Sequence, residues 1–201
     1  MDYAKFSRLA PTDYAGPLKR ENFMDFNLKA LWQPIPRISG PAYTVKMAPG
    51  DNLMLHAAIY QAPIGSVIVA DTGSLDFAVA GGNVCAIAQK RGIAGFVIDG
   101  LIRDIKEVRE AKFPVFARGV IPMPGIKKEI LPLNETITCG GVTVEPGDII
   151  VADEEGVAVI PKNKAEDIYT KAKNKADQEA KMSLEEWEAN HRQIVKKHLS
   201  L

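Results

Sequence analysis

Gly95-Phe-Val-Ile-Asp-Gly-Leu-Ile-Arg-Asp104 says more about the architecture of this chain than any other segment. It begins as an apolar strand over 95–99, breaks at Gly100 and ends in the adjacent pair Arg103 and Asp104. The carboxyl end of such a strand faces the crevice in which α/β proteins usually bind ligands. A guanidinium can hold a carboxylate through two parallel hydrogen bonds, and a neighbouring carboxylate can ligate a hard divalent cation. The pair therefore indicates a site for an anionic ligand and a metal ion.

A purely structural role for Asp104 is the alternative. Asp104 and Glu107 have the spacing of a capping box, in which the first side chain caps a helix and the second bonds back to it. This interpretation predicts a helix over 104–111 and requires no ligand. The pair alone does not decide between the two roles.

A second apolar strand, over 66–71, lies upstream and leads to the diglycine Gly81-Gly82. The alanine-rich segment 83–91 that follows has high helix propensity. Gly81 to Val84 would then form the first helical turn, whose free N–H groups can bind an anion. A diglycine at a helix start can also be no more than a tight connection.

The remaining pattern alternates strands and helices up to residue 120 and then changes to short β segments. Strands are expected over 42–47, 66–71, 95–99 and 115–120, and helices over 51–61, 83–91 and 104–111. The later segments, over 136–138, 142–144, 148–152 and 157–160, are expected to form a second sheet packed on the first.

Both ends of the chain lie outside this pattern. We expect one domain with an N-terminal arm (1–40), a core (41–161) and a helical tail (162–201). In the arm, an amphipathic helix is expected over 23–32, and prolines should prevent regular pairing over 34–43. In the tail, a charged helix should start near residue 163, and residues 182–201 should continue it or form a second helix. The tail's expected buried positions are Ile168, Ala172, Ala176, Ala180, Leu184, Trp187, Ile194 and Val195.

Several separated motifs, in this order, resemble those of the RraA-like family. They are Gly50-Asp-Asn-Leu53, His56, Gly81, Arg91-Gly-Ile-Ala-Gly95, Asp99-Gly-Leu-Ile-Arg-Asp104, Phe113-Pro-Val-Phe-Ala-Arg-Gly119 and the segment 153–161. That family contains divalent-metal 4-hydroxy-4-methyl-2-oxoglutarate and 4-carboxy-4-hydroxy-2-oxoadipate aldolases and also protein regulators of RNase E. With this resemblance, the expected fold class is α/β, a single-domain layered α-β-β-α sandwich of the swivelling β/β/α type with C-terminal helices.

The resemblance also implies roles for residues of the site. Arg103 would bind the carboxylate and keto oxygen of a pyruvyl group, and Asp104 would ligate Mg²⁺ or Mn²⁺. The backbone of Gly81, Gly82, Asn83 and Val84 would complete the substrate cradle. His56 lies at a matching family position and is kept as a supporting residue behind the site, although a lone helical histidine is more often structural. Asp71 and Asp99 are further candidates for such support.

One position departs from the family pattern. Aldolase members carry an acidic residue twenty-one positions before the arginine, where this chain has Gly82. In the family that acid orients a metal-bound water, so its loss concerns proton transfer rather than binding. Asp71 and Asp76 are the available replacements in the sequence.

The function expected from these residues is that of a metal-dependent class II-type lyase, an aldolase or decarboxylase that acts on 2-oxo acids through a pyruvate enolate. Decarboxylation of oxaloacetate requires no base to deprotonate a C4 hydroxyl, whereas retro-aldol cleavage does. Gly82 therefore favours decarboxylation. The alternative is a non-catalytic regulator of a ribonuclease. The resemblance further implies a homotrimer or hexamer.

The composition limits the classes of partner and metal that we expect the protein to bind. The chain has 25 basic and 25 acidic residues, so no global field attracts nucleic acid or an anionic membrane. Its amino terminus has no apolar core of signal-peptide length and no segment approaches a membrane span, which predicts a cytoplasmic protein. Cys85 and Cys139 form no CxxC motif, and His191 and His198 have no partner at metal-ligand spacing, so a zinc site is not expected.

Overall fold

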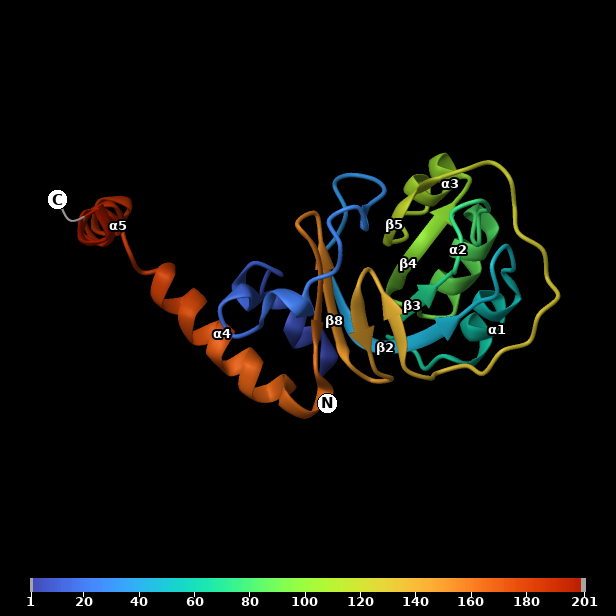
Figure 1. Cartoon of the computed structure of the whole chain (residues 1–201), viewed down its shortest axis with the longest axis horizontal. Helices are drawn as coiled ribbons and strands as arrows, with labels where there is room; N and C mark the ends of the chain where they lie inside the picture. Colours follow the sequence, from blue (N-terminus) through green and yellow to red (C-terminus); the bar gives the residue numbers. More distant parts are fainter. Residues whose placement is uncertain (1, 200–201) are drawn as a thin grey trace.

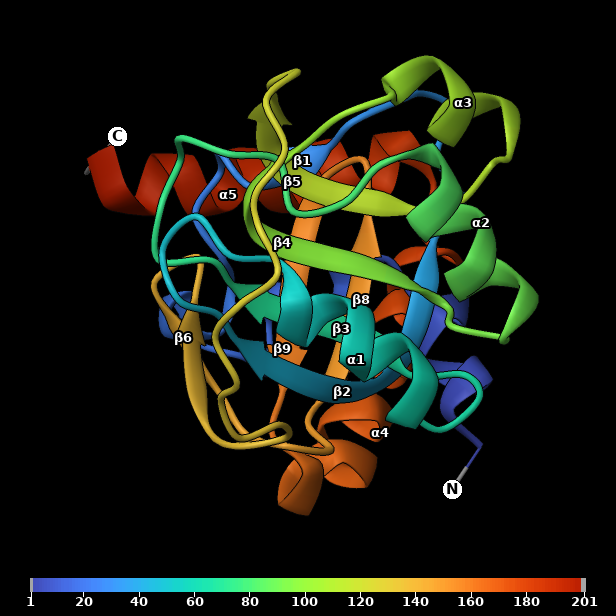
Figure 2. The same cartoon turned by 90° about the vertical axis from the view of Figure 1, so that its right-hand side faces the viewer.

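The computed structural model describes residues 2–199. Within them, the main sheet has seven strands in the order β1-β5-β4-β3-β2-β8-β9. Figure 1 and Figure 2 show α1, α2 and α3 together on one side of strands β2 to β5, and α4 with the N-terminal segment on the outer side of β8. The α/β fold class is confirmed.

The strands are β1 (Lys29–Ala30), β2 (Ile38–Lys46), β3 (Val67–Asp71), β4 (Gly95–Ile102), β5 (Val115–Val120), β6 (Ile137–Cys139), β7 (Val142–Val144), β8 (Ile149–Asp153) and β9 (Gly156–Ile160). The helices are α1 (Leu53–Gln61), α2 (Gly82–Lys90), α3 (Ile105–Glu110), α4 (Ala165–Glu179) and α5 (Leu184–Leu199).

Strands β2, β3, β4 and β5 form the parallel part of the sheet. Their sequences are almost continuously apolar, as expected for strands covered on both faces. All but the last residue of β3 is buried, and so are the first four residues of β4. This half of the molecule follows the expected alternation of strands and helices, and it brings the carboxyl ends of β3 and β4 together.

The C-terminal strands do not form a separate second sheet. The strand β2 is long enough to serve two partners: its residues 38–41 pair with β8, and its residues 42–46 pair with β3. The hairpin β6–β7 alone stands apart among the described strands. Pro41 lies inside β2, at the point where the strand changes partner, so proline does not prevent pairing there.

The expected helix over 23–32 is wrong. Phe23 forms a bridge with Ala158 of β9, and Lys29 and Ala30 pair with β5. This segment therefore runs from β9, at one end of the sheet, to β5, where it adds the edge strand β1, and it nearly closes the sheet. Both edges present unpaired backbone groups, and pairing with them outweighs the local helical pattern.

The tail consists of two helices rather than one. The first, α4, buries Ile168 and Ala172 as expected, against a second apolar cluster that includes Phe6 and Tyr14 of the N-terminal segment. The second, α5, is a helix as one alternative predicted, but its apolar side chains are not buried within the chain. Among the described residues, no helix has the length and apolar character needed to cross a membrane.

Candidate functional site

A β-bulge sets the direction of the end of β4. The strand does not break at Gly100 but continues to Ile102, and its register with β5 shifts between Ile98 and Leu101. A bulge of this kind bends a strand and redirects the residues beyond it. Gly100 makes it possible, because an ideal Cβ there would lie 2.4 Å from Cγ2 of Thr72. The bulge is followed directly by the candidate pair.

Asp104 is not the helix cap that its spacing suggested. Its backbone is left-handed, with φ 57° and ψ 41°, and its side chain makes no capping hydrogen bond to α3. The carboxylate instead accepts a hydrogen bond of 3.1 Å from the N–H of Gly82, at the start of α2. It also lies 3.5 Å from Nε of Arg103. A left-handed conformation at a non-glycine residue costs about 1–3 kcal/mol and is typical of functional positions.

Two glycines leave room for this pair. An ideal Cβ on Gly81 would lie 2.4 Å from Oδ2 of Asp104 and 3.1 Å from Cγ of Arg103. One on Gly82 would lie 2.8 Å from Cβ of Glu107, on α3. Neither glycine has a positive φ, so space rather than backbone conformation requires them. The diglycine is therefore a close-contact point between α2 and the end of β4.

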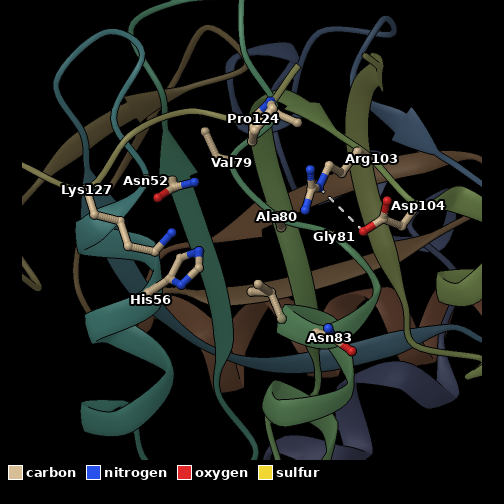
Figure 3. Close-up of a pocket in the computed structure, with 12 residues that line it drawn as sticks. Asn52, His56, Val79, Ala80, Gly81, Asn83, Arg103, Asp104, Pro124 and Lys127 are labelled. Carbon is tan, nitrogen blue, oxygen red and sulfur yellow. Dashed lines mark ion pairs between the residues drawn. The ribbon is translucent and has the colours of Figure 1, made fainter. Parts of the chain in front are cut away.

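Arg103 and Asp104 open onto a pocket of about 100 Å³ (Figure 3). Figure 3 shows Gly81 and Asn83 on the same side as this pair, and Asn52, His56 and Lys127 across from it. Val84 also lines the pocket, so of the predicted cradle only Gly82 is not among its lining residues. The first N–H groups of α2 have no carbonyl within the helix to bond to, and that of Gly82 already binds Asp104.

The wall of the pocket opposite Arg103 and Asp104, which is formed by Asn52, His56 and Lys127 and is called the far wall below, carries polar atoms without partners. Oδ1 of Asn52 and Nε2 of His56 are buried and make no hydrogen bond. Burial and the nearby Lys127 ammonium lower the pKa of His56, and a hydrogen bond to the backbone of Val79 only partly opposes them. The imidazole is therefore neutral near pH 7. Buried polar atoms normally have partners, so this wall is suited to a polar ligand.

Asp51 fixes the far wall in place. Its carboxylate accepts hydrogen bonds from the N–H groups of Leu53 at 2.7 Å, Lys128 at 2.7 Å and Glu129 at 2.9 Å. Burial raises the pKa of Asp51, but these hydrogen bonds outweigh it, so the pKa lies below its ordinary value. One carboxylate thus ties the start of α1 to the loop that carries Lys127.

Sequence reasoning missed Asn52 and Lys127 as pocket residues. Asn52 lies four residues before His56, a spacing that places both on one face of α1, so this signal was present. Lys127 follows the turn Pro122-Met-Pro-Gly125 and carried no comparable signal, because its position depends on contacts with a distant helix.

Two of the supporting candidates lie elsewhere. Asp71 and Asp99 face each other across β3 and β4 and line a separate depression with Arg118. The carboxylate of Asp99 binds Arg118 and accepts a hydrogen bond of 2.7 Å from the N–H of Gly140, so it joins β5 to the β6–β7 hairpin. Asp76 bonds to Ser74 in an exposed loop. Of the supporting candidates, His56 alone lines the pocket of Arg103.

The pocket suits a hard cation better than zinc. Within residues 2–199 no cluster of three or more His, Cys, Asp or Glu side chains could hold a metal. Asp104 is the one carboxylate among the residues that line this pocket. Mg²⁺ commonly binds one or two carboxylates and takes its other ligands from water and substrate, whereas structural zinc sites need four protein ligands. Asp104 therefore fits Mg²⁺ or Mn²⁺ bound together with an oxygen-rich substrate.

Comparisons with known proteins agree with this fold. Residues 13–159 match the family model described as "RraA-like: Aldolase/RraA". A protein of Halalkalibacterium halodurans named "Putative 4-hydroxy-4-methyl-2-oxoglutarate aldolase" is 46% identical over 160 residues, which cover 77% of this chain and 76% of the relative.

Two solved structures extend the likeness. RraAS2 of Streptomyces coelicolor, described as an unusual member of the RNase ES inhibitor RraA protein family, superposes with a TM-score of 0.76 at 27% identity and covers 88% of this chain and 92% of its own. The RNA-processing inhibitor RraA from Thermus thermophilis superposes with a TM-score of 0.64 at 28% identity, covering 70% of this chain and 85% of its own. The chain belongs to the RraA-like family of aldolases and RraA proteins.

Proposed function

We propose that this protein is a divalent-metal-dependent lyase that cleaves the C3–C4 bond of a 2-oxo acid and leaves pyruvate, with oxaloacetate decarboxylation favoured over aldol cleavage. The observation that carries the proposal is the convergence of Arg103, Asp104 and the first turn of α2 on one pocket. The name of the relative at 46% identity, a putative aldolase, supports the lyase class.

Each component has a chemical task. The guanidinium of Arg103 can donate two hydrogen bonds to the carboxylate of the substrate and oppose the negative charge that develops as the bond breaks. A cation held by Asp104 would supply Lewis-acid stabilisation of that same charge. The N–H groups of Asn83 and Val84 lie at the positive end of the α2 dipole and favour an anion in front of them.

The far wall indicates a substrate with a second anionic or polar group. Lys127 supplies a positive charge there, and Asn52 and His56 supply the unpartnered polar atoms. Oδ1 of Asn52 only accepts hydrogen bonds, and so does Nε2 of a neutral imidazole whose N–H bonds the backbone of Val79, so the Lys127 ammonium is the group that can donate to a second carboxylate of the substrate. We therefore infer a dicarboxylic 2-oxo acid, such as oxaloacetate, rather than a 2-oxo acid with an apolar tail.

Proton transfer distinguishes the two reactions. In decarboxylation the leaving group departs as CO₂ and no C4 hydroxyl has to be deprotonated. The chain has no side chain at Gly82, and the carboxylates of Asp71 and Asp99 lie outside the pocket. The absence of a second carboxylate among the residues described in the pocket supports decarboxylation.

The test is oxaloacetate turnover with Mg²⁺ or Mn²⁺ and with the metal removed by a chelator. Arg103→Ala removes charge-assisted hydrogen bonds worth about 1.5–3 kcal/mol each, so kcat/KM should fall roughly tenfold to a hundredfold. Arg109→Ala, an exposed arginine on α3, is the matched control and should leave turnover unchanged. Full activity in the Arg103→Ala variant would contradict the proposed site.

The competing function is that of a non-catalytic binding protein. The observation in its favour is the structural likeness to proteins described as RraA and as RNase ES inhibitor relatives. It predicts no metal-dependent turnover of any 2-oxo acid. Metal-dependent loss of oxaloacetate that falls at least roughly tenfold in the Arg103→Ala variant decides against it.

A further inference from the structure

An exposed apolar patch lies where α1 and α2 end, at the opposite end of α2 from the candidate site. Figure 2 shows these two helices next to each other on the same side of the sheet. The patch is called the α1–α2 patch below, and the residues that line its hollow of about 540 Å³ are Tyr60, Ala62, Ile64, Ile87, Lys90 and Arg91. Its large apolar side chains, Tyr60, Ile64 and Ile87, are 41–84% exposed. Exposed apolar residues gathered in one place usually mark an interaction surface.

The turn that carries Ile64 is fixed by backbone hydrogen bonds. The N–H of Gly65 donates to the carbonyl of Gly92 at 2.7 Å, and the N–H of Ser66 donates to the carbonyl of Pro63 at 3.1 Å. The Ile64 side chain lies over Gly92, because an ideal Cβ on that glycine would lie 2.9 Å from Cγ2 of Ile64. Ile64 is therefore held at the surface in advance, which reduces the entropy lost when a partner covers it.

Arg91 is held in place by the end of α1. Its Nε donates to the carbonyl of Ile59 at 2.9 Å, and a terminal nitrogen donates to the carbonyl of Tyr60 at 3.2 Å. The guanidinium also lies 5.1 Å from the centre of the Tyr60 ring. These contacts give Arg91 a structural role, because they satisfy free carbonyls at a helix end. A guanidinium has five N–H donors, so three remain for a ligand.

The positive charge of the patch has no acidic counterpart beside it. The segments 52–70 and 77–98, which include α1 and α2, contain no Asp or Glu, although the whole chain has 25. Within residues 2–199, neither Lys90 nor Arg91 forms an ion pair. The ends of α1 and α2 each carry a partial negative charge of about half a unit, so the two full positive charges dominate. The patch is therefore complementary to an acidic partner.

We propose that the α1–α2 patch binds an acidic amphipathic segment of another protein. Apolar side chains of that segment enter the hollow between Tyr60, Ile64 and Ile87. Carboxylates that flank them bind Lys90 and the remaining donors of Arg91. Tyrosine and arginine are among the residue types that contribute most to binding at protein interfaces. A helical segment would present its apolar anchors at intervals of three or four residues.

The shape and charge of the patch favour a protein partner over a membrane. Segments that bind anionic lipid typically carry about four to eight Lys or Arg residues, whereas two line this patch. The patch is also hollowed, which suits inserted side chains better than a flat lipid surface. None of its residues lines the pocket of Arg103, so the proposal does not depend on the proposed lyase activity.

Two synthetic peptides test the proposal on the full-length chain. The first has about 18 residues, enough to form a helix, and places Leu and Phe four positions apart among Glu residues. The second carries Gln in place of every Glu. Fluorescence anisotropy of the labelled peptides should show that the wild type binds the acidic peptide at least roughly tenfold more tightly.

Variants of the patch show where the acidic peptide binds. Ile64→Ser removes an exposed apolar contact, and Lys90→Glu reverses a charge, so each should weaken binding at least roughly tenfold. Arg91 is left in place because it also caps α1. Ile130→Ser and Lys181→Glu are the matched controls, since both side chains are exposed and lie outside the patch. Both controls should keep the wild-type affinity.

Several results would overturn the proposal. The first is equal binding of the two peptides, or no binding of the acidic one. The second is binding that neither patch variant weakens. The third is binding of the wild type to phosphatidylserine vesicles without binding to the acidic peptide. Light scattering covers the last occupant, because a lower mass for Lys90→Glu than for the wild type would assign the patch to a second copy of this chain.

Discussion

The Cβ of Glu107 fills the space in which a side chain at Gly82 would begin. It lies 2.8 Å from the position of an ideal Cβ on Gly82, although the two residues belong to different helices. Real Cβ contacts are not this short, so no side chain can be added at Gly82 unless Glu107 moves. The position of α3 in this chain therefore excludes an acidic side chain at residue 82.

This contact determines how the family's acid can be restored. Gly82→Asp alone should lower the melting temperature and disturb the hydrogen bond to Asp104. Gly82→Asp combined with Glu107→Gly frees the space, at about 1 kcal/mol for a glycine inside an exposed helix. A positioned carboxylate that relays a proton typically contributes about 10² to 10⁴ in rate. Cleavage of 4-hydroxy-4-methyl-2-oxoglutarate, measured against Glu107→Gly alone, should therefore rise at least roughly tenfold.

The opposite result is also informative. Suppose that the Gly82→Asp, Glu107→Gly variant folds but cleaves 4-hydroxy-4-methyl-2-oxoglutarate no faster, and that the wild type already cleaves it well. Another residue must then relay the proton. His56 would then be the residue to test, because its unpartnered Nε2 lies in the pocket. His56→Gln would then lower aldol cleavage far more than oxaloacetate decarboxylation.

Gly81 gives a second, simpler prediction. A methyl group on Gly81 would lie 2.4 Å from the Asp104 carboxylate, so Gly81→Ala should push that carboxylate away from its position. We expect kcat/KM for oxaloacetate to fall at least roughly tenfold, because a small misplacement of a site group has a large effect on rate. Gly119→Ala in β5 is the control, since the nearest atom to its Cβ is 3.4 Å away. Equal activity of the two variants would show that the position of Asp104 is unimportant.

Much of the site could be predicted because its residues follow strands. Arg103 and Asp104 end an apolar segment, and Gly81 precedes a strong helix former, so local periodicity located both. The bulge at Gly100 could not be predicted, because it depends on the contact with Thr72, which directly follows the neighbouring strand β3. The capping-box spacing at Asp104 was misleading for the same reason: the nearest free donor is Gly82, which is remote in sequence.

The fold likewise has parts that local sequence patterns predict and parts that depend on distant contacts. Helices and strands between residues 42 and 120 follow from local patterns that burial reinforces. The segment 23–32 was predicted to be a helix because its apolar residues have that period, but the sheet edges of β9 and β5 decide the conformation of residues 23–30. Propensity is a weak prior wherever unpaired strand edges compete for the same backbone groups.

Assembly is the next expectation to measure. We expect a trimer or hexamer, so light scattering at micromolar concentration should give three or six times 21.9 kDa. Val120, Met123 and Ile126 are 53–61% exposed near the pocket, on and after β5, and form the kind of surface that a neighbouring subunit covers. Met123→Glu should reduce the mass and the activity together, whereas Asp76→Asn in an exposed loop should change neither. A monomeric wild type would contradict the expectation.

Asp51 links stability to the far wall of the pocket. Asp51→Asn keeps the shape of the side chain but removes the charge that three backbone N–H groups share. A hydrogen bond to a charged group contributes about 1.5–3 kcal/mol, so denaturant unfolding at pH 7 should show a loss of at least that size. KM for oxaloacetate should rise as well, because the loop that carries Lys127 loosens. Asp76→Asn again serves as the control, and unchanged stability of Asp51→Asn would contradict the role assigned to this carboxylate.

The pH dependence of the same variant checks the physical cause. The pKa of Asp51 is lowered in the folded chain, so above the unfolded-state value of about 3.9 the ionised carboxylate stabilises the fold, and this contribution is lost as the pH falls through the folded pKa. The difference in free energy of unfolding between wild type and Asp51→Asn should therefore be constant from pH 7 to about pH 5 and shrink below that. A difference that stays constant down to about pH 2 would show that the variant acts through packing, and that the charge of Asp51 does not hold the loop.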